Sequence, residues 1–267
     1  MAAPKTLEMG RVLSNEQAAD GVFVMRVTAP KIAPRVEPGQ FVHVRAAGNP
    51  VQFLRMPLAV YDVHDEEGEE GSIELCYQVV GEGTRQLSSL VAGDRLDLLG
   101  PVGNGWRPPE GTKRALLVGG GVGAPALNLL ARGLTARGVR TDVALGAQTY
   151  AKLSCSGKLR ESVAPEKGLV HVATDDGSFG VTGFVTAVSS RLIGSGVYDY
   201  VAVCGPTPMM RNAVQPALRR GVACQVSMET LMACGVGACL SCVVDTVDGR
   251  KRCCVDGPVF DASEVVW

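Results

Sequence analysis

The sequence predicts an antiparallel β-barrel over residues 1–108, a doubly wound parallel α/β domain over 109–224 and a small cysteine-rich unit over 225–267. Three observations lead to this division. Strand-like segments separated by turns fill the first part, strands alternate with helical patterns in the second, and five cysteines crowd between 234 and 254 in the third. A chain of 267 residues is long enough for two domains and a small appendage.

Composition narrows the function class before any motif is considered. The chain is 46% apolar with a net charge of −1, so it lacks the basic face of a nucleic-acid-binding protein. The sequence shows neither a signal-peptide pattern nor an apolar run of about 18 residues, which predicts a cytoplasmic protein that does not enter a membrane. In a reducing compartment, nine cysteines favour metal or redox chemistry over disulfides.

The barrel is predicted from about six short strands with no helical pattern between them. The segments that carry this pattern are 21–28, 38–45, 56–61, 72–80 and 94–99. The acidic run at 65–70 is expected to be a solvated hairpin tip. The turn Gly81-Glu82-Gly83-Thr84 is open between an anion-binding turn and an ordinary hairpin.

The α/β domain follows a Pro-Pro linker at 108–112. Its first strand, 114–119, runs into a helix expected to end near Arg137, and further strands are predicted at 142–146, 169–174 and 200–204. Helical patterns at 183–192 and 208–219 complete an alternation typical of a parallel, doubly wound sheet.

A glycine-rich turn directly follows the first strand of this domain, where backbone N–H groups and the helix dipole favour a pyrophosphate. Many α/β folds need such a turn merely to connect, but its position favours dinucleotide binding. No Gly-Lys-Ser/Thr follows, so it is not a Walker motif. Cys204-Gly205-Pro206 ends a later strand, where open parallel sheets bind ligands, although a buried inert cysteine would look the same. The turn comprises Gly119, Gly120, Gly121, Gly123 and Pro125.

The cysteine-rich segment carries the most specific pattern in the chain. Cys234, Cys239 and Cys242 have the C-x4-C-x2-C spacing of plant-type [2Fe–2S] ligands, and a fourth cysteine follows at 253 or 254. Structural zinc more often uses two C-x2-C pairs, and only one is present here. Because adjacent strand residues point to opposite faces, only one of Cys253 and Cys254 should reach the cluster. The residues alone leave that choice open.

These motifs together resemble the ferredoxin reductase family. The appended segment with Asp256-Gly257-Pro258-Val259-Phe260 resembles one branch of it, the electron-transfer subunits of NAD-linked dihydroorotate dehydrogenases. Further matching stretches lie at 38–42, 100–105, 174–180 and 227–230, so the similarity covers nearly the whole chain. The resemblance implies Cys254, which precedes x-Asp-Gly-Pro, as the fourth cluster ligand.

The same resemblance implies FAD on the barrel and NAD on the α/β domain. It places Cys204 at the nicotinamide, with Gly205 and Pro206 beside it. Where the family usually carries Arg-Pro-x-Ser, this chain has Met56 and Ala59, so Arg55 or Arg85 is the candidate for the flavin phosphate. The expected flavin contacts are Arg55, Pro57, Leu58, Ala59, Tyr77, Gln78, Gly83 and Thr84.

The resemblance also implies a function. Electrons would pass from a dihydroorotate-oxidising, FMN-containing partner through the cluster and FAD to NAD+, in pyrimidine (UMP) biosynthesis, within a hetero-oligomer expected to be a heterotetramer. The lack of an arginine after Leu145-Gly-Ala-Gln-Thr favours NAD over NADP. One alternative is the corresponding subunit of a sulfhydrogenase or of an NAD(P)H-dependent ferredoxin or sulfide reductase. Another is a non-catalytic redox sensor, which would need no hydride site.

Overall fold

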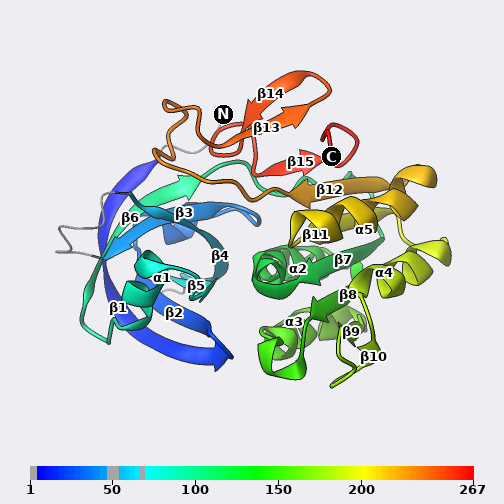
Figure 1. The fold of residues 1–267 in the computed structure, drawn as a ribbon, viewed down its shortest axis with the longest axis horizontal. Helices are drawn as coiled ribbons and strands as arrows, with labels where there is room; N and C mark the ends of the chain where they lie inside the picture. Colours follow the sequence, from blue (N-terminus) through cyan, green and yellow to red (C-terminus); the bar gives the residue numbers. More distant parts are fainter. Residues whose placement is uncertain (1–4, 47–53, 66–69) are drawn as a thin grey trace.

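The computed structural model describes residues 5–46, 54–65 and 70–267, and it contains a barrel, a seven-stranded sheet and a small hairpin (Figure 1). The tip of the expected acidic hairpin, 66–69, lies outside the described residues. The barrel is closed and antiparallel, in the order β1-β2-β5-β4-β3-β6, as the sequence predicts. Its strands are β1 (Thr6–Ala19), β2 (Val22–Thr28), β3 (Phe41–Ala46), β4 (Met56–His64), β5 (Ser72–Gln78) and β6 (Arg95–Val102).

Two short helical elements accompany the barrel, η1 (Ala33–Arg35) and α1 (Glu82–Ser88). The strand β1 was not expected as a separate element, although Asp20-Gly21 marks the hairpin that joins it to β2. Gly21 has φ +67°, a left-handed conformation that glycine adopts without strain.

The second sheet has the order β10-β9-β8-β7-β11-β12-β15 and is parallel except for β15, which runs antiparallel to β12. The strands are β7 (Arg114–Gly120), β8 (Arg140–Ala147), β9 (Val170–Thr174), β10 (Val181–Thr182), β11 (Tyr200–Cys204), β12 (Ala223–Ser227) and β15 (Val259–Asp261). Its helices are η2 (Gly121–Leu127), α2 (Asn128–Ala136), η3 (Tyr150–Lys152), α3 (Ser156–Val163), η4 (Ala164–Glu166), α4 (Val185–Gly194) and α5 (Thr207–Arg219).

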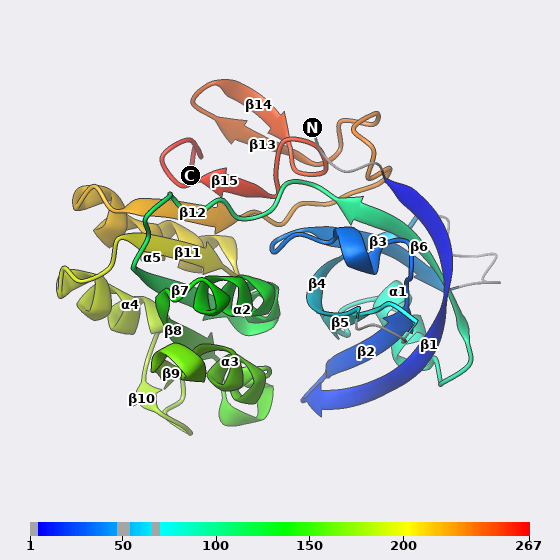
Figure 2. The ribbon, with the colours of Figure 1, turned by 180° about the vertical axis from the view of Figure 1, so that it is seen from behind.

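Alternating residues of the central strands build two cores, one on each face of this sheet. Leu116 and Val118 of β7 pack with the core that includes α4 and α5, while Ala115 and Leu117 pack with α2 and α3. Because both faces are covered, these strands are apolar throughout, which is why they read as continuous hydrophobic runs. Figure 2 shows the α2–α3 side of the domain next to the barrel. The doubly wound prediction is confirmed.

The helix expected directly after β7 begins with a 3₁₀ segment, η2, before α2 starts at Asn128. Gly121, Gly123 and Pro125 explain the difference, because glycine weakens a helix and proline has no N–H to donate. At the other end of the domain, the expected boundary between 224 and 225 falls inside β12. The cysteine-rich segment is therefore attached through strands β12 and β15, with the hairpin β13 (Val243–Thr246) and β14 (Gly249–Arg252) beyond the sheet.

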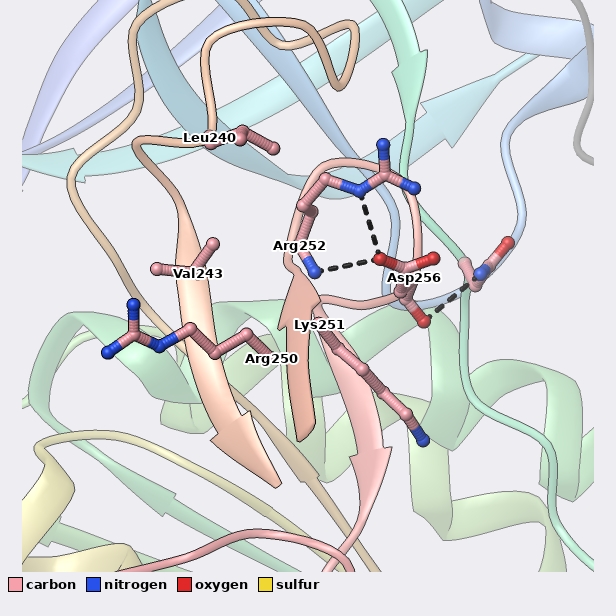
Figure 3. Close-up of a pocket in the computed structure, with 7 residues that line it drawn as sticks. Leu240, Val243, Arg250, Lys251, Arg252 and Asp256 are labelled. Atoms are coloured by element: carbon pink, nitrogen blue, oxygen red, sulfur yellow. Dashed lines mark hydrogen bonds and ion pairs between the residues drawn. The ribbon is translucent and has the colours of Figure 1, made fainter. Parts of the chain in front are cut away.

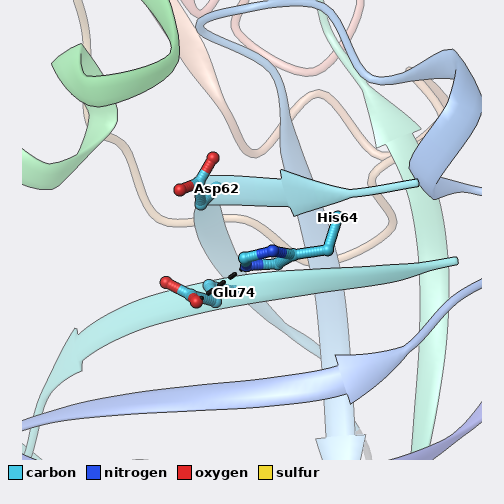
Figure 4. Close-up of side chains that lie close together, drawn as sticks. All are labelled: Asp62, His64 and Glu74. Atoms are coloured by element: carbon cyan, nitrogen blue, oxygen red, sulfur yellow. Dashed lines mark hydrogen bonds and ion pairs between the residues drawn. The ribbon is translucent and has the colours of Figure 1, made fainter. Parts of the chain in front are cut away.

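A cluster of charged side chains joins the barrel to α2 and α3. Lys158 Nζ of α3 lies 2.6 Å from Asp62 and 2.5 Å from Glu74, and Arg132 of α2 also pairs with Asp62. Figure 4 shows Asp62, His64 and Glu74 converging, with His64 Nε2 at 2.8 Å from Glu74. Burial opposes ionisation of Asp62, but Lys158, the Val63 N–H and Arg132 outweigh it and lower its pKa. Because Lys158 and Arg132 already form ion pairs with these carboxylates, the cluster is an interdomain ion-pair network rather than a metal site.

We expect Lys158→Met to reduce the free energy of unfolding by about 1–3 kcal/mol, because it keeps the aliphatic stem but leaves buried carboxylates short of a cation. The matched control is Arg85→Met, which removes an exposed pair with Glu82 and should change stability by less than about 0.5 kcal/mol. Urea unfolding of both variants measures the difference. Equal losses would contradict a structural role for the network.

Candidate functional site

The glycine-rich turn lies where the strand order of the sheet reverses. β7 is central, β8 and β9 follow on one side, and β11 and β12 on the other, so the carboxyl ends of β7 and β11 flank the switch point. Open α/β sheets bind ligands at this position. Gly119 at the end of β7 is in register with Cys204 at the end of β11, so the structure brings the two predicted motifs together.

The two loops touch through their backbones. A Cβ on Gly123 would lie 2.7 Å from Gly205 Cα, so no larger residue fits without moving a loop. Gly121, in contrast, has φ +52° and open space around the position of a Cβ, which leaves its backbone accessible to a ligand. Burial raises the pKa of the Cys204 thiol to about 12, so this cysteine is neutral at physiological pH and suits lining a site rather than acting as a base. Pro125 lies within η2, and Pro206 precedes α5.

The predicted flavin strand, β4, presents two different faces. Leu58 packs towards the barrel core, whereas Ala59 packs towards the core of the α/β domain that contains η2 and α2. The glycine-rich segment η2 packs against β4 and β5. One edge of the barrel therefore lies beside the dinucleotide turn, which is the juxtaposition that a flavin and a nicotinamide require.

The side chains of the other expected flavin contacts have different surroundings. Arg55 binds Asp97 through one guanidinium nitrogen at 2.7 Å, while its buried Nε has no hydrogen-bond partner among the described residues. Tyr77 is buried in the barrel core, where its hydroxyl donates to Asn15, so its side chain is committed to packing. Thr84 accepts hydrogen bonds from the Val80 and Gly81 N–H groups and caps α1.

Gln78 ends β5 and Pro57 lies on β4, opposite His43 of β3. Gly83 lies in the first turn of α1, so the predicted Gly81–Thr84 turn is a helix start rather than a hairpin. Arg85 is exposed and paired with Glu82. Sequence reasoning missed Asp97, whose carboxylate also binds Arg45 at 2.9 Å and so fixes both arginines at this edge of the barrel.

The loop that carries the first cysteines wraps its backbone around sulfur. Gly235 and Gly237 have φ of +67° and +84°, and Leu240 adopts +58° without being glycine. The Val236 N–H donates to Cys234 Sγ at 3.4 Å. Burial opposes ionisation of Cys234, but N–H groups of Val236, Cys239 and Ala238, with the Cys239 thiol, lower its pKa to about 6. The loop is thus built to hold a thiolate.

Four of the cysteine sulfurs form two pairs. The Cys239 thiol hydrogen-bonds to Cys234, and the Cys254 thiol lies against Cys242. Within the described residues, no three cysteine sulfurs lie within 4.8 Å of one another. Two sulfurs for each of two irons is the donor arrangement of a [2Fe–2S] centre, so these residues fit the cluster that the spacing predicts.

The two adjacent cysteines face different neighbours. Cys253 lies against Thr230, and burial raises its pKa to about 11. Burial and then the Cys242 thiol raise the pKa of Cys254 to about 11, while the Gly237 N–H from the cysteine loop lowers it. The orientation of Cys254 towards the loop supports its assignment as the fourth ligand.

Arg252 holds the loop that carries Cys234 and Cys239 in place. Its guanidinium donates to the Gly237 carbonyl at 3.2 Å, and its Nε and backbone N–H both donate to Asp256 (Figure 3). Asn104, which follows the barrel, donates to the carbonyls of Val255 and Asp256. The pocket of about 790 Å³ beside this brace is lined by Leu240, Val243, Arg250, Lys251, Arg252, Asp256 and Asn104. Each of its three cations pairs with a carboxylate of the same segment, so we assign no anion site there.

We expect Asp256→Asn to accelerate loss of the cluster about two- to fivefold, since a charge-assisted hydrogen bond worth about 1.5–3 kcal/mol is reduced by partial exposure. Asp245→Asn breaks an exposed pair with Arg250 on the same hairpin and serves as the control. Burial opposes ionisation of Asp256, but the hydrogen bonds and positive charge of Arg252 outweigh this effect and lower the pKa of Asp256. The brace is therefore complete above about pH 4 and is lost as the pH falls through the lowered pKa. Cluster absorbance followed over time checks both effects; equal rates in the two variants would contradict the brace.

Within residues 5–46, 54–65 and 70–267, no helix combines the length and apolar character needed to cross a bilayer.

Comparison with known proteins gives a consistent result. Residues 229–266 match the iron–sulfur cluster binding domain of dihydroorotate dehydrogenase B. The chain is 39% identical over 261 residues to dihydroorotate dehydrogenase B (NAD(+)), electron transfer subunit, of Bacillus velezensis, covering 95% of this chain and 96% of that protein. The corresponding subunit of Bacillus caldolyticus is also 39% identical, over 262 residues, 96% of each chain.

Solved structures agree. A structure of the NADH-dependent reduced ferredoxin-NADP oxidoreductase superposes with a TM-score of 0.86 at 33% identity, covering 97% of this chain and 90% of that one. The ferredoxin reductase in carbazole 1,9a-dioxygenase has a TM-score of 0.69 at 22% identity, over 83% of this chain and 68% of that chain, and shows the shared fold. Identity above one third over nearly the full length, with the same cysteine segment, establishes that this chain belongs to the family of dihydroorotate dehydrogenase B (NAD(+)) electron transfer subunits.

Proposed function

We propose that this chain passes electrons from a dihydroorotate-oxidising partner to NAD+, in the biosynthesis of UMP. One observation carries the proposal. The barrel edge formed by β3 and β4 contacts the cysteine loop on one side, through His43 and Gly235, and the glycine-rich segment η2 on the other. The candidate sites for cluster, flavin and nicotinamide therefore lie side by side.

That order suits the chemistry of the three groups. A [2Fe–2S] centre exchanges single electrons, a nicotinamide accepts a hydride, and a flavin does either. The chain's own residues supply the positions: Cys234, Cys239, Cys242 and Cys254 for the cluster, the partly buried start of β4 with Arg55 for FAD, and the turn at 119–125 with Cys204 for NAD. None of these residues is placed as a base for oxidising dihydroorotate, so that step belongs to the partner.

The partner is proposed to be an FMN-containing catalytic subunit in a heterotetramer. The relatives' name, electron transfer subunit, implies a second subunit. Leu240, which directly follows exposed Cys239, is 62% exposed, and Leu231, whose carbonyl accepts a hydrogen bond from Ser241, is 88% exposed. Apolar side chains beside a redox centre suit the docking of that subunit.

Two further assignments follow from the same residues. Asp175 and Asp176 directly follow β9, and their N–H groups donate to the carbonyls of Ala147, which ends β8, and of Gln148, so two carboxylates stand at the edge where the adenosine would extend. Their charge would repel a 2′-phosphate, which supports NAD over NADP. None of the nine cysteines, all of which lie in the described residues, forms a disulfide, which supports a cytoplasmic location.

A second candidate is an NAD(P)H-dependent ferredoxin reductase subunit, favoured by the 33% identity and TM-score of 0.86 to the NADH-dependent reduced ferredoxin-NADP oxidoreductase. The cofactor positions would be unchanged, and only the partner would differ. A redox sensor, in contrast, would need no hydride site such as the one proposed at the turn 119–125.

The test uses the purified chain with its cofactors under anaerobic conditions. We expect NADH to bleach the flavin absorbance within seconds and to generate the electron paramagnetic resonance (EPR) signal of a reduced [2Fe–2S] centre, whereas NADPH does so far more slowly. If cluster and flavin stay oxidised in the presence of NADH, the proposed function is wrong and the non-catalytic redox sensor is the remaining interpretation.

A further inference from the structure

His43 is a buried imidazole whose polar atoms have no partner. Its side chain on β3 is 0% exposed, and neither Nδ1 nor Nε2 has a hydrogen-bond partner within the described residues. Its ring packs beside Phe41, with centroids 5.7 Å apart. A neutral imidazole carries one N–H donor and one acceptor, and a buried donor without an acceptor costs about 1–3 kcal/mol. Such a group indicates an acceptor that joins the protein later.

The ring is held against the cysteine loop. A Cβ built on Gly235 would lie 3.1 Å from His43 Nε2, so the loop approaches the ring as closely as a glycine allows. Gly235 directly follows Cys234 and has φ +67°, which a residue with a side chain adopts only under strain. The absence of a Cβ at 235 thus serves both the turn of the loop and its contact with His43.

The charges around His43 favour an anionic acceptor. Burial, Arg55 and Lys5, in that order of importance, lower the pKa of His43 to about 4, so the ring is neutral at physiological pH. Lys5 Nζ also donates to the Cys254 carbonyl, at 3.3 Å. Thiolates and sulfides are hydrogen-bond acceptors, and a cluster with four thiolates carries net negative charge. The loop's own N–H groups serve Cys234 from one side, and His43 approaches from the barrel side.

We propose that His43 donates an N–H hydrogen bond to a sulfur of the cluster centre and thereby raises its reduction potential. The proposal rests on the cluster assigned above. A hydrogen bond to sulfur stabilises the more negative, reduced state of the centre more than the oxidised state, which is how outer residues tune such potentials. His43 is thus a positioning and tuning residue that joins the barrel to the cluster.

The experiment compares His43→Phe with His43→Gln in the cofactor-loaded protein, by EPR-monitored redox titration. Phenylalanine fills the space without a donor. We expect the equilibrium constant for reduction of the cluster to fall about tenfold, which for one electron lowers the reduction potential by 59 mV. Glutamine keeps an N–H donor and should retain most of the wild-type potential. The flavin potentials should not change in either variant.

Three outcomes overturn the proposal: an unchanged cluster potential in His43→Phe, an equal shift in both variants, or a shift of the flavin instead. Wild-type protein labelled with ¹⁵N-histidine offers a check that requires no variant. Pulsed EPR of the reduced centre should show a weak ¹⁵N coupling, and its absence would also overturn the proposal. A wild-type chain with no [2Fe–2S] signal would instead refute the proposed function, so the two failures are distinguishable.

Discussion

Cys254→Ser abolishes the iron–sulfur cluster, whereas Cys253→Ser leaves it in place. This is the largest effect we expect, because removal of a ligand should weaken binding by more than the 10- to about 100-fold loss typical of an outer-shell partner. The Cys254 thiol hydrogen-bonds with Cys242 and receives the Gly237 N–H, while the side-chain hydrogen bond of Cys253 is with Thr230. The two cysteines are adjacent and equally buried, so each is the natural control for the other.

Iron content and the visible spectrum of each purified variant measure the result. Retained flavin absorbance shows that both proteins are folded. A cluster present in Cys254→Ser and absent in Cys253→Ser would reverse the assignment of the fourth ligand. A cluster present in both would mean that neither residue is required.

Gly123→Ala raises the KM for NADH at least about tenfold, since overpacking at a rigid contact costs about 1–3 kcal/mol. A methyl group at 123 would lie 2.7 Å from Gly205 Cα and 2.8 Å from its nitrogen, and backbone atoms cannot rotate away. The turn after β7 and the loop after β11 must then separate, which displaces the N–H groups expected to hold the pyrophosphate.

The control is Gly133→Ala in α2, where the nearest atom to the new methyl is 4.0 Å away. Alanine in a helix interior should stabilise the protein by up to about 1 kcal/mol and leave the KM unchanged. NADH oxidation with ferricyanide as acceptor measures both variants, while flavin and iron content confirm the integrity of the rest. An unchanged KM in Gly123→Ala would remove the turn from the dinucleotide site.

Local patterns made much of this fold predictable. Continuous apolar runs at β7, β8 and β11 result from burial on both faces, and the cysteine spacing reflects a loop that must wrap around sulfur. The switch point followed from the alternation of strands and helices, because connection rules leave few topologies for such an order.

Contacts between distant segments were not predictable. The strand β1 carries exposed Leu7 and Met9, so its pattern does not separate an inner from an outer face. The helix α3 has a weakly apolar sequence, and its role in the Lys158 network depends on a barrel strand more than 80 residues away. Nothing in the linear sequence reveals that the ring of His43 meets Gly235. The choice between Cys253 and Cys254 likewise required the direction of each side chain.

The central claim concerns the donor of the electrons, and the native complex tests it most directly. This chain is purified anaerobically with whatever subunit accompanies it, dihydroorotate and NAD+ are added, and NADH formation is measured at 340 nm. We expect a rate on the order of one turnover per second or more. We predict NADH formation that requires a second, flavin-bearing subunit. An intact complex containing flavin and cluster that forms no NADH from dihydroorotate, yet exchanges electrons with ferredoxin, would contradict the account and move this chain to the ferredoxin-linked branch.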